Sequence, residues 1–263
     1  MMQQTNIKKS IVYMTHYSKS SHVGTSLSIA DILYTLYFKV LNVDPFNPEC
    51  PERDKFILSK GHGSAALYAT LAERGFFPKD FLDRYYVNGG LLPGHLDKFA
   101  APGIELSTGS LGHGLSVGVG MSIANGSSGN PGQVYVLLGD GECNEGSVWE
   151  AVMLSATLRL SNITAIIDYN RLQGFGETNE VINQENMAAR WTAFGWNAFE
   201  VNGHDTVELE RVFRIKSDRP KVVIAHTVKG KGVSYMENRL EWHYKSPNEE
   251  QYKQAIAELD GLL

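Results

Sequence analysis

The stretch that decides the fold is "QVYVLLGDGECNEGSVWE", residues 133–150. Its first part is apolar and β-prone, which predicts a buried strand over 133–140. Asp140 lies between two glycines where this strand ends, and helical periodicity follows over 147–159. Because ligands of open parallel sheets bind beyond the carboxyl ends of the strands, this charge predicts a ligand site.

The same alternation of strands and helices extends away from this stretch. Further strand-like runs are 55–59, 163–170, 197–201 and 221–228. Helical patterns cover 26–41, 63–74, 115–125, 147–159, 184–194, 206–215 and 249–262, while 1–50 and 80–110 predict helices and long loops packed around the sheet. The fold class predicted is α/β, with a mostly parallel central sheet, helices on both faces and one domain over 1–263.

Composition excludes several classes of function. The 263 residues carry a net charge of −5 and contain no Lys/Arg run, so the sequence lacks the basic patch that is typical of nucleic-acid-binding proteins. The apolar runs are too short to span a bilayer, and the N-terminus lacks the apolar core of a signal peptide. Cys50 and Cys143 do not make a disulfide framework, and we expect a cytoplasmic protein without a membrane or nucleic-acid partner.

Oxygen ligands follow two neighbouring strands of the predicted sheet. Asp140 ends one strand and Asn170 ends the next after a single helical crossover. Mg²⁺ prefers such hard oxygens and completes its shell with water and phosphate. Gly139 and Gly141 leave room for a phosphate, and the helix starting near Glu145 offers its N-terminus to an anion. A Mg²⁺-diphosphate site is the hypothesis. The alternative is that Gly-Asp-Gly is a turn and Asn170 a cap, which the pairing of the two residues weakens.

The spacing of these residues resembles a known cofactor motif. "GDG", then 28 residues, then Asn170 resembles the thiamine diphosphate motif. Further segments lie in the order seen in the transketolase family: "SSHVGTSLSIADILYTLYF", "RDKFILSKGHGSAALYATLAERG", "LPGHLD", "STGSLGHGLSVGVGMS", "GDGECNEGSVWEA", "DYNRLQ" and "TVKGKGVSYMEN". They span nearly the whole chain, and the resemblance implies the thiamine diphosphate-binding fold.

The resemblance implies a role for each matching residue near the cofactor. Asp140 and Asn170 resemble the side-chain ligands of Mg²⁺ (Ca²⁺ or Mn²⁺ in its place), with the backbone carbonyl of Leu172 as a third ligand. Gly141 and Glu142 resemble residues that line the diphosphate. The loop that holds the aminopyrimidine end is matched by Gly109, Ser110 and Leu111, and the buried glutamate that links the two halves of the family's site is matched by Glu145.

Histidines recur in the matching segments, and imidazole exchanges protons near neutral pH. In the family pattern His22 and His95 resemble contacts to the donor sugar. His62 resembles a diphosphate contact, and His243 resembles a histidine that serves both the diphosphate and proton transfer. Lys229 is expected to reach the diphosphate, with a solvated loop lysine as the alternative. No role is assigned to His113, and His16, His204 and His226 are expected to be structural.

Two departures from the family pattern put the substrate in question. "SHVGTS" at 21–26 replaces the commoner "GHPGGS", and "WHYK" places Tyr244 where a smaller residue is commoner. The first lies in the donor-contact region. Neither departure removes a predicted cofactor ligand.

The resemblance covers only half of a family active site. Single-chain transketolases carry a second domain that binds the pyrimidine and supplies a glutamate, and nothing in this chain resembles it. We therefore expect the diphosphate-binding, N-terminal subunit of a split transketolase, paired with a separate C-terminal subunit in an α₂β₂ heterotetramer. The expected reaction moves a two-carbon ketol unit from a ketose to an aldose, with sugar phosphates of the pentose phosphate pathway as the expected substrates. The alternatives are a 1-deoxyxylulose-5-phosphate-type synthase, a transketolase of a specialised sugar pathway, and a non-catalytic scaffolding paralogue.

Overall fold

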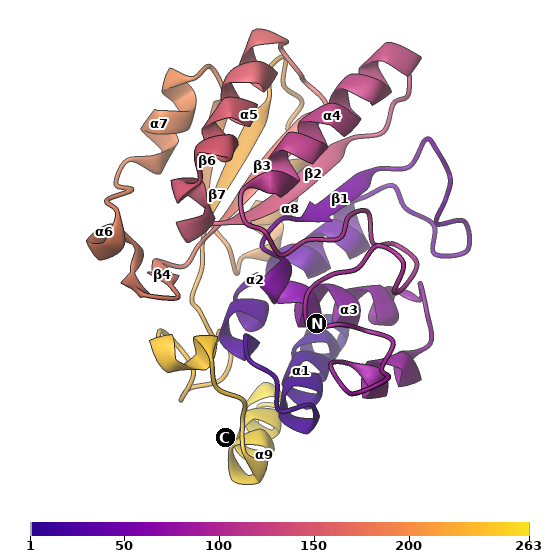
Figure 1. The fold of residues 1–263 in the computed structure, drawn as a ribbon, viewed down its shortest axis with the longest axis vertical. Helices are drawn as coiled ribbons and strands as arrows, with labels where there is room; N and C mark the ends of the chain where they lie inside the picture. The colour runs from indigo at the N-terminus through magenta and orange to yellow at the C-terminus, as the bar shows by residue number, and fades with distance from the viewer. Residues whose placement is uncertain (1, 263) are drawn as a thin grey trace.

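A five-stranded parallel sheet forms the centre of the molecule (Figure 1). The computed structural model describes residues 2–262. The strands are β1 (Lys55–Leu58), β2 (Val134–Gly139), β3 (Ile163–Tyr169), β6 (Asn197–Asn202) and β7 (Lys221–His226). Their order is β1-β2-β3-β7-β6, and every neighbouring pair is parallel. The predicted parallel sheet is therefore confirmed, strand for strand.

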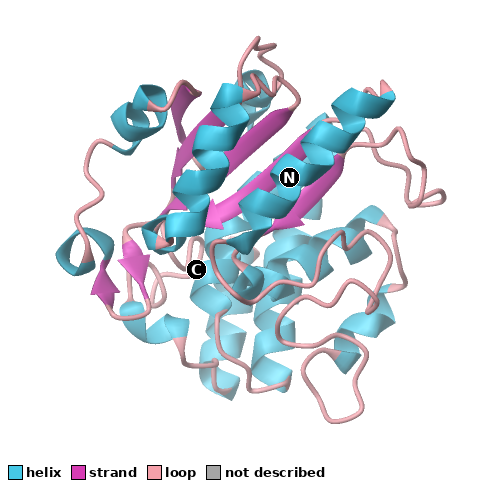
Figure 2. Cartoon of the chain, turned by 45° about the horizontal axis from the view of Figure 1, so that its top comes forward, coloured by secondary structure: helices cyan, strands magenta, loops and turns pink. Residues whose placement is uncertain are grey.

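Helices cover both faces of this sheet, as Figure 2 shows. The helices are α1 (Met2–Tyr17), α2 (Val23–Thr35), α3 (Ser64–Arg74), α4 (His113–Ser128), α5 (Gly146–Thr157), α6 (Thr178–Val181), α7 (Met187–Ala193), α8 (Thr206–Phe213) and α9 (Glu249–Leu259). One buried core joins α4, α5 and α7 to the sheet, and the other joins α1, α2, α3 and α8 to its opposite face. The α/β layering expected from the sequence is confirmed.

The pleat of β2 explains why its sequence is apolar throughout. Val134, Val136 and Leu138 enter the core beneath α4 and α5, and Tyr135 and Leu137 enter the core on the other face. Side chains alternate between faces along a strand, so a strand covered on both sides shows a continuous apolar run. Asp140 is the first residue after this run and lies at the carboxyl edge of the sheet.

The helix limits differ in part from those predicted. The helix predicted over 26–41 begins earlier, and α2 passes into a π-helical turn at Leu36–Val40. The helix predicted over 184–194 was too long, because Asn186 takes a left-handed conformation (φ 60°) and α7 starts at Met187. A two-stranded hairpin of β4 (Leu172–Gln173) and β5 (Gly176–Glu177), together with α6, was not predicted.

Two sequence expectations about the environment can be compared with the structure. Across residues 2–262, no helix combines the length and apolarity needed to cross a membrane. Cys50 and Cys143 are both free thiols, which agrees with the expectation that they form no disulfide framework.

Candidate functional site

A cavity of about 390 Å³ opens at the carboxyl edge of the sheet. Apart from Ser110, every residue predicted for the site lines it: His22, His62, His95, Gly109, Leu111, Asp140, Gly141, Glu142, Glu145, Asn170, Leu172, Lys229 and His243. These residues come from separate stretches of the chain. The fold therefore brings together side chains that the sequence scatters from position 22 to position 243.

Asp140 is a buried carboxylate at the centre of this cavity wall, with 2% of its surface exposed. Its Oδ1 accepts a 2.8 Å hydrogen bond from the Gly141 N–H. Its Oδ2 accepts from the Arg171 N–H at 2.7 Å and from the Thr178 hydroxyl at 3.0 Å. Burial, and then repulsion from Asp168, raise the pKa of Asp140 above its usual value. A bound cation would reverse both effects, so the site fits a metal ion.

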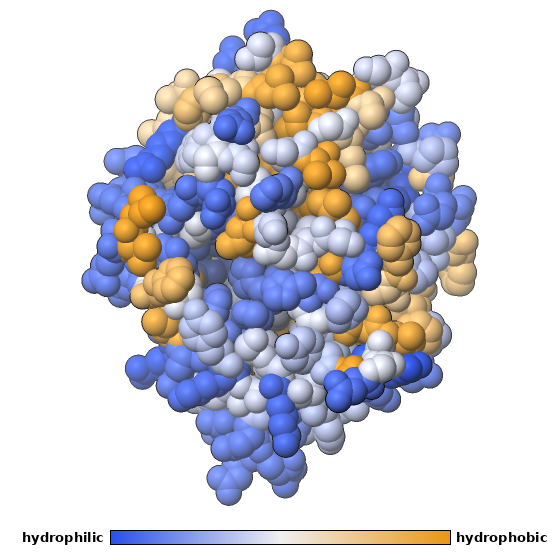
Figure 3. All heavy atoms as spheres, viewed as in Figure 1, coloured by the Kyte–Doolittle hydropathy of each residue, from blue (hydrophilic) through white to orange (hydrophobic). Residues whose placement is uncertain are grey.

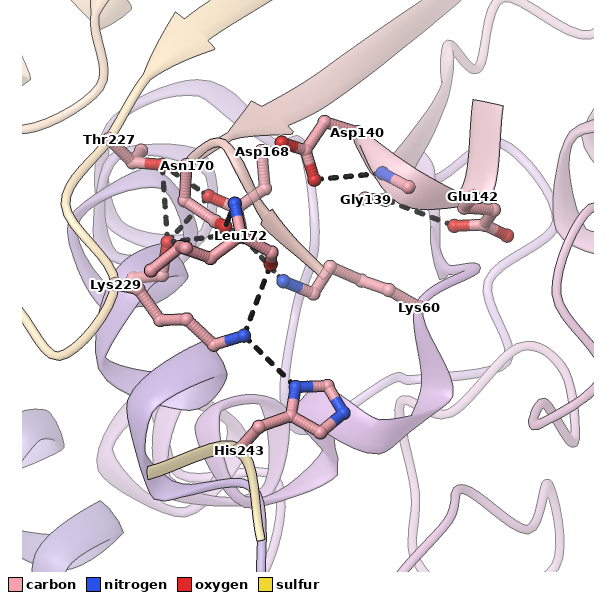
Figure 4. Close-up of polar contacts among 12 residues, drawn as sticks. Lys60, Gly139, Asp140, Glu142, Asp168, Asn170, Leu172, Thr227, Lys229 and His243 are labelled. Atoms are coloured by element: carbon pink, nitrogen blue, oxygen red, sulfur yellow. Dashed lines mark hydrogen bonds and ion pairs between the residues drawn. The ribbon is translucent and has the colours of Figure 1, made fainter. Parts of the chain in front are cut away.

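The other two predicted ligands lie directly after β3 (Figure 4). Asn170 Oδ1 accepts a 3.0 Å hydrogen bond from the Leu172 N–H, and the Leu172 carbonyl accepts one from Lys229 Nζ at 3.1 Å. Both oxygens retain a second lone pair. In the part of the chain that the structure describes, no three His, Cys, Asp or Glu side chains form a metal-binding cluster. The donor set is one carboxylate, one amide and one backbone carbonyl, which suits Mg²⁺ rather than a soft metal.

A buried ion pair lies beneath these oxygens and was missed by sequence reasoning. Lys60 Nζ pairs with the carboxylate of Asp168, and both side chains are almost fully buried. Although burial alone would raise it, the pKa of Asp168 is lowered, because Lys60 and the hydroxyls of Ser28 and Thr227 stabilise the charged form. Lys60 lies in the matching motif "SKGHG", so the sequence held a signal for it beside His62.

Lys229 is the second buried lysine of the site, with 1% of its surface exposed. Its Nζ donates to the Leu172 carbonyl and lies 2.9 Å from His243 Nδ1. Burial and the nearby Lys60 lower the pKa of Lys229 to about 8. The alternative of a solvated loop lysine is therefore wrong, because its stem is packed and its ammonium is directed into the cavity wall.

Four histidines surround the open side of the cavity. The ring centroid of His22 lies 5.3 Å from that of His62, 5.9 Å from His95 and 5.1 Å from His243. Burial and neighbouring charges lower the pKa of His22 to about 4 and that of His243 to about 3. Burial and Lys60 also hold the pKa of His62 well below its usual value. These three rings are therefore neutral at pH 7, so each offers one N–H donor and one acceptor.

The backbone of His22 is held in an uncommon conformation. Its φ is 74°, in the left-handed region, at the residue that precedes α2. Its N–H donates a 3.1 Å hydrogen bond to the His243 carbonyl. Left-handed non-glycine residues are costly and cluster at functional sites. This hydrogen bond ties the two histidines together through the backbone as well as through their rings.

Glu142 is a buried carboxylate that fixes the surrounding loops. It accepts hydrogen bonds from the N–H groups of Gly112 at 2.9 Å and Gly139 at 3.0 Å, and from the Ser59 hydroxyl. Its oxygens therefore connect the ends of β1 and β2 to the loop before α4. Burial raises the pKa of Glu142, and these donors oppose that rise.

Three residues predicted to bind the cofactor, Gly109, Ser110 and Glu145, are exposed in this chain. Glu145, matched to a buried glutamate, is exposed at the cavity rim. Ser110 is exposed and lies outside the cavity lining. His113, for which no role was assigned, is also exposed and bonds to its own loop, at the Leu111 carbonyl. The expectation that Glu145 is buried is thus not met within this chain.

Sequence reasoning missed several residues of the cavity wall. They are Thr25, Lys60, Asn144, Gln173, Gly174 and Phe175. The Nε2 of Gln173 is buried and has no hydrogen-bond partner within residues 2–262. It lies beside Gly141, where an added Cβ would come within 2.8 Å of the Gln173 Cβ. The Gln173 amide is therefore a free donor beside Gly141, whose missing side chain leaves space in the cavity. This arrangement suits an anionic ligand.

The remaining histidines serve the scaffold, as expected. His16 contacts the Pro247 carbonyl at 2.8 Å. His204 lies 2.7 Å from Asp31 Oδ2 and accepts a hydrogen bond from the Val228 N–H at 2.8 Å. His226 lies 2.7 Å from Glu200. None of these three histidines lines the cavity.

The fold and the site define the class of protein. Residues 6–259 match the family model described as transketolase, thiamine diphosphate binding domain. The chain belongs to the transketolase family.

The chain matches relatives of about its own length and also longer relatives. It is 44% identical to a subunit of the apulose-4-phosphate transketolase of Phocaeicola vulgatus, over 100% of this chain and 94% of that protein. It is 43% identical to a 6-deoxy-6-sulfo-D-fructose transketolase subunit of Clostridium sp., over 91% of this chain and 88% of that protein. Human transketolase is 36% identical over 96% of this chain, which spans 41% of that protein.

Solved transketolase structures share the fold. The transketolase of Leishmania mexicana superposes with a TM-score of 0.92 at 28% identity, over 98% of this chain and 41% of that one. The Campylobacter jejuni transketolase gives 0.91 at 29% identity, over 99% of this chain and 43% of that one. The chain thus spans less than half the length of these proteins, and they confirm the thiamine diphosphate-binding fold.

Proposed function

We propose that this chain is the diphosphate-binding subunit of a split transketolase, a transferase that depends on thiamine diphosphate and Mg²⁺. The reaction would move a two-carbon ketol unit from a ketose donor to an aldose acceptor. The observation that carries the proposal is the cluster of His22, His62, His95 and His243 beside the buried oxygens of Asp140 and Asn170. Neutral imidazoles and hard oxygen ligands in one cavity suit a phosphorylated cofactor and a polyhydroxylated substrate.

The chain offers a set of contacts for the metal and the diphosphate. Asp140, Asn170 and the Leu172 carbonyl would hold Mg²⁺, with phosphate and water oxygens completing the shell. Lys229 supplies a positive charge, and the N-terminus of α5 directs backbone N–H groups toward an anion. When bound, thiamine diphosphate supplies a thiazolium carbon that carries the two-carbon unit between sugars.

The histidines would bind the sugar and move its protons. A ketose presents hydroxyl and carbonyl oxygens that require donors and acceptors at the same time. Because the pKa of His22 is about 4, its ring is neutral at pH 7 and can accept a hydrogen bond from a sugar hydroxyl. Lys229 Nζ donates to His243 Nδ1, which leaves the Nε2–H of that ring as its free donor. His95, at the exposed edge of the cluster, would bind the outer part of the sugar.

A second chain would complete the site. The two relatives of similar length are named as transketolase subunits, which supports this view. Glu145 is exposed at the cavity rim, where the resemblance implies a buried link between two halves. Figure 3 shows apolar surface over α4 and α5, and Met153, Leu154 and Leu158, on α5 and at its end, are each about half exposed. An uncovered apolar helix face supports a partner, and an α₂β₂ assembly is the arrangement we propose.

A transketolase of a specialised sugar pathway is the form that the relatives favour. The relatives at 43–44% identity are named for apulose 4-phosphate and 6-deoxy-6-sulfo-D-fructose, and neither name refers to the pentose phosphate pathway. A donor that carries a phosphate or a sulfonate at its far end is therefore the substrate class proposed. The departure at 21–26 surrounds His22 and is where a changed donor preference would originate.

Purification with a candidate partner subunit provides the test. The chain is co-expressed with a transketolase C-terminal subunit, and the complex is assayed with Mg²⁺, thiamine diphosphate and a panel of donors. Xylulose 5-phosphate, a sulfonated ketose and pyruvate separate the alternatives: transfer from a ketose supports the proposal, and condensation of pyruvate supports the synthase alternative. Full ketol transfer by the chain alone would contradict the split site, and binding of cofactor without transfer from any donor would favour the scaffolding alternative.

A further inference from the structure

We propose that Asp168 is a positioning residue that fixes the orientation of the Asn170 carboxamide, so that its oxygen rather than its nitrogen faces the metal position. The inference rests on the proposed function, because it concerns one of the predicted ligands of Mg²⁺. Asp168 lies two residues before Asn170, at the end of β3. The role of Asp168 is distinct from ligation itself.

The carboxylate of Asp168 is saturated by donors inside the protein. It is fully buried, with 0% of its surface exposed. Its Oδ1 accepts from the hydroxyls of Ser28, at 2.6 Å, and Thr227. Its Oδ2 pairs with Lys60 Nζ and accepts from Asn170 Nδ2 at 2.7 Å (Figure 4). Four donors occupy the four lone-pair positions of a carboxylate, so no oxygen of Asp168 is left for a metal ion.

Only one end of the Asn170 amide can bind this carboxylate. An ionised carboxylate accepts hydrogen bonds and cannot donate them, so the amide must turn its nitrogen toward Asp168. The opposite end then has to be the oxygen, which already accepts from the Leu172 N–H at 3.0 Å. An amide flip would place an oxygen against the Asp168 carboxylate and a nitrogen against the Leu172 N–H. Both contacts would be repulsive, so a single orientation is selected.

This selection matters because an asparagine is ambiguous in a way that an aspartate is not. Asp140 presents oxygen to a cation in either flip of its side chain, whereas Asn170 does so in only one. Partners that orient a metal ligand commonly change metal affinity 10–100-fold when they are removed. Lys60 supports this orientation of Asn170 because it keeps the Asp168 carboxylate ionised.

The test compares two neutral replacements of Asp168 that differ in whether they can accept a hydrogen bond. In a Lys60→Met background, which avoids an unpaired buried ammonium, Asp168→Asn keeps an acceptor for Asn170 and Asp168→Leu removes it. Mn²⁺ binding to the full chain is measured by electron paramagnetic resonance of the free ion, with thiamine diphosphate present. We expect the Leu variant to bind Mn²⁺ at least about 10-fold more weakly than the Asn variant.

Equal affinities in the two variants would overturn the positioning role, because loss of charge alone weakens both equally. Thermal unfolding checks that each variant is folded, and a pair with smaller changes in β-strand preference, Asp168→Thr and Asp168→Val, repeats the comparison if the Leu variant is unfolded. A wild-type chain that binds no Mn²⁺ either alone or assembled with its partner subunit would instead overturn the proposed cofactor site.

Discussion

Lys229 Nζ lies 2.9 Å from His243 Nδ1, so a buried ammonium and a neutral imidazole share one hydrogen bond at the edge of the cavity. The contact is stable only with the proton on the lysine, since burial and neighbouring charges hold the pKa of His243 near 3 and that of Lys229 near 8. The lysine therefore determines which ring nitrogen of His243 carries a proton. The ring presents Nε2–H to the cavity as a consequence.

Removing this contact should affect catalysis more than stability. Lys229→Met leaves both tautomers of His243 available, and we expect kcat for ketol transfer in the assembled enzyme to fall at least about 10-fold. The free energy of unfolding should change little, because the variant also removes a buried charge. Steady-state kinetics and chemical denaturation measure the two effects. Lys216→Met, at an exposed position, is the matched control, and equal kinetics in both variants would contradict the role.

The carboxylate of Asp140 should carry the metal dependence of cofactor binding. Asp140→Ala removes a buried carboxylate that is a predicted metal ligand, and we expect thiamine diphosphate affinity in the presence of Mg²⁺ to fall about 100-fold or more. Tryptophan fluorescence titration with and without Mg²⁺ gives the affinity. Asp218→Ala, at an exposed position, is the control. Unchanged affinity in Asp140→Ala would place the metal elsewhere.

The histidine cluster should make the fold sensitive to acid. The unfolded chain binds protons on these rings near pH 6.5, whereas the folded pKa is about 4 for His22 and about 3 for His243. The unfolded state therefore binds more protons between these values, and stability is lost as pH falls from about 6.5 to about 4. After solvent screening, each ring should account for about 1–2 kcal/mol. His22→Gln should reduce the loss of Tm between pH 7 and about pH 4.5, and an unchanged slope would contradict the shift.

An effect on the KM for the donor should distinguish His22 from His113, another histidine of the matching segments. His22→Ala should raise KM for the ketose donor about 10-fold, while His113→Ala, whose ring lies outside the cavity, should leave it within about twofold. Thiamine diphosphate affinity should be similar in both variants, because neither ring is a predicted metal or diphosphate ligand. A KM effect of equal size in the two variants would show that the loops, not the ring, are responsible.

Two glycines of α4 offer a packing test on one helix. A Cβ at Gly114 would lie 2.4 Å from the Ser59 Oγ, whereas a Cβ at Gly120 would meet nothing within 4 Å. Gly114→Ala should destabilise the fold by about 1–3 kcal/mol because helix and strand must separate. Gly120→Ala should stabilise it by up to about 1 kcal/mol. Urea denaturation measures both, and a stabilising Gly114→Ala would show that α4 can shift away from β1 at no cost.

The sheet and most of the site could be predicted because their signals are local. The strand over 133–140 is apolar on both faces, and Asp140 follows it directly, so sequence pattern alone places the residue at the sheet edge. Helix limits were less accurate where tertiary contacts decide them. Gln184 donates to the Asp140 carbonyl at 2.8 Å, and this long-range contact holds the chain away from the helix predicted there.

Other parts of the site could not be predicted because they depend on pairs far apart in the chain. Lys60 and Asp168 are 108 positions apart and appear as ordinary charges in the sequence. Gln173 carries no pattern that distinguishes it from a loop amide. Glu145 could be assigned only by resemblance, and nothing in its local sequence predicts that it is exposed at the cavity rim.

The hydrogen bond from the His22 N–H to the His243 carbonyl joins the early part of the chain to its final part. Between these two residues lies the whole sheet. The contact therefore closes a long loop, and the entropy cost of this loop is offset only when both segments are docked. The segment after residue 239 supplies the buried side chains of Trp242 and Ala255 as well as His243, and its helix α9 packs against α1. The far end of the chain therefore ties the histidine cluster to the core, so that the site and the fold depend on the same closing segment.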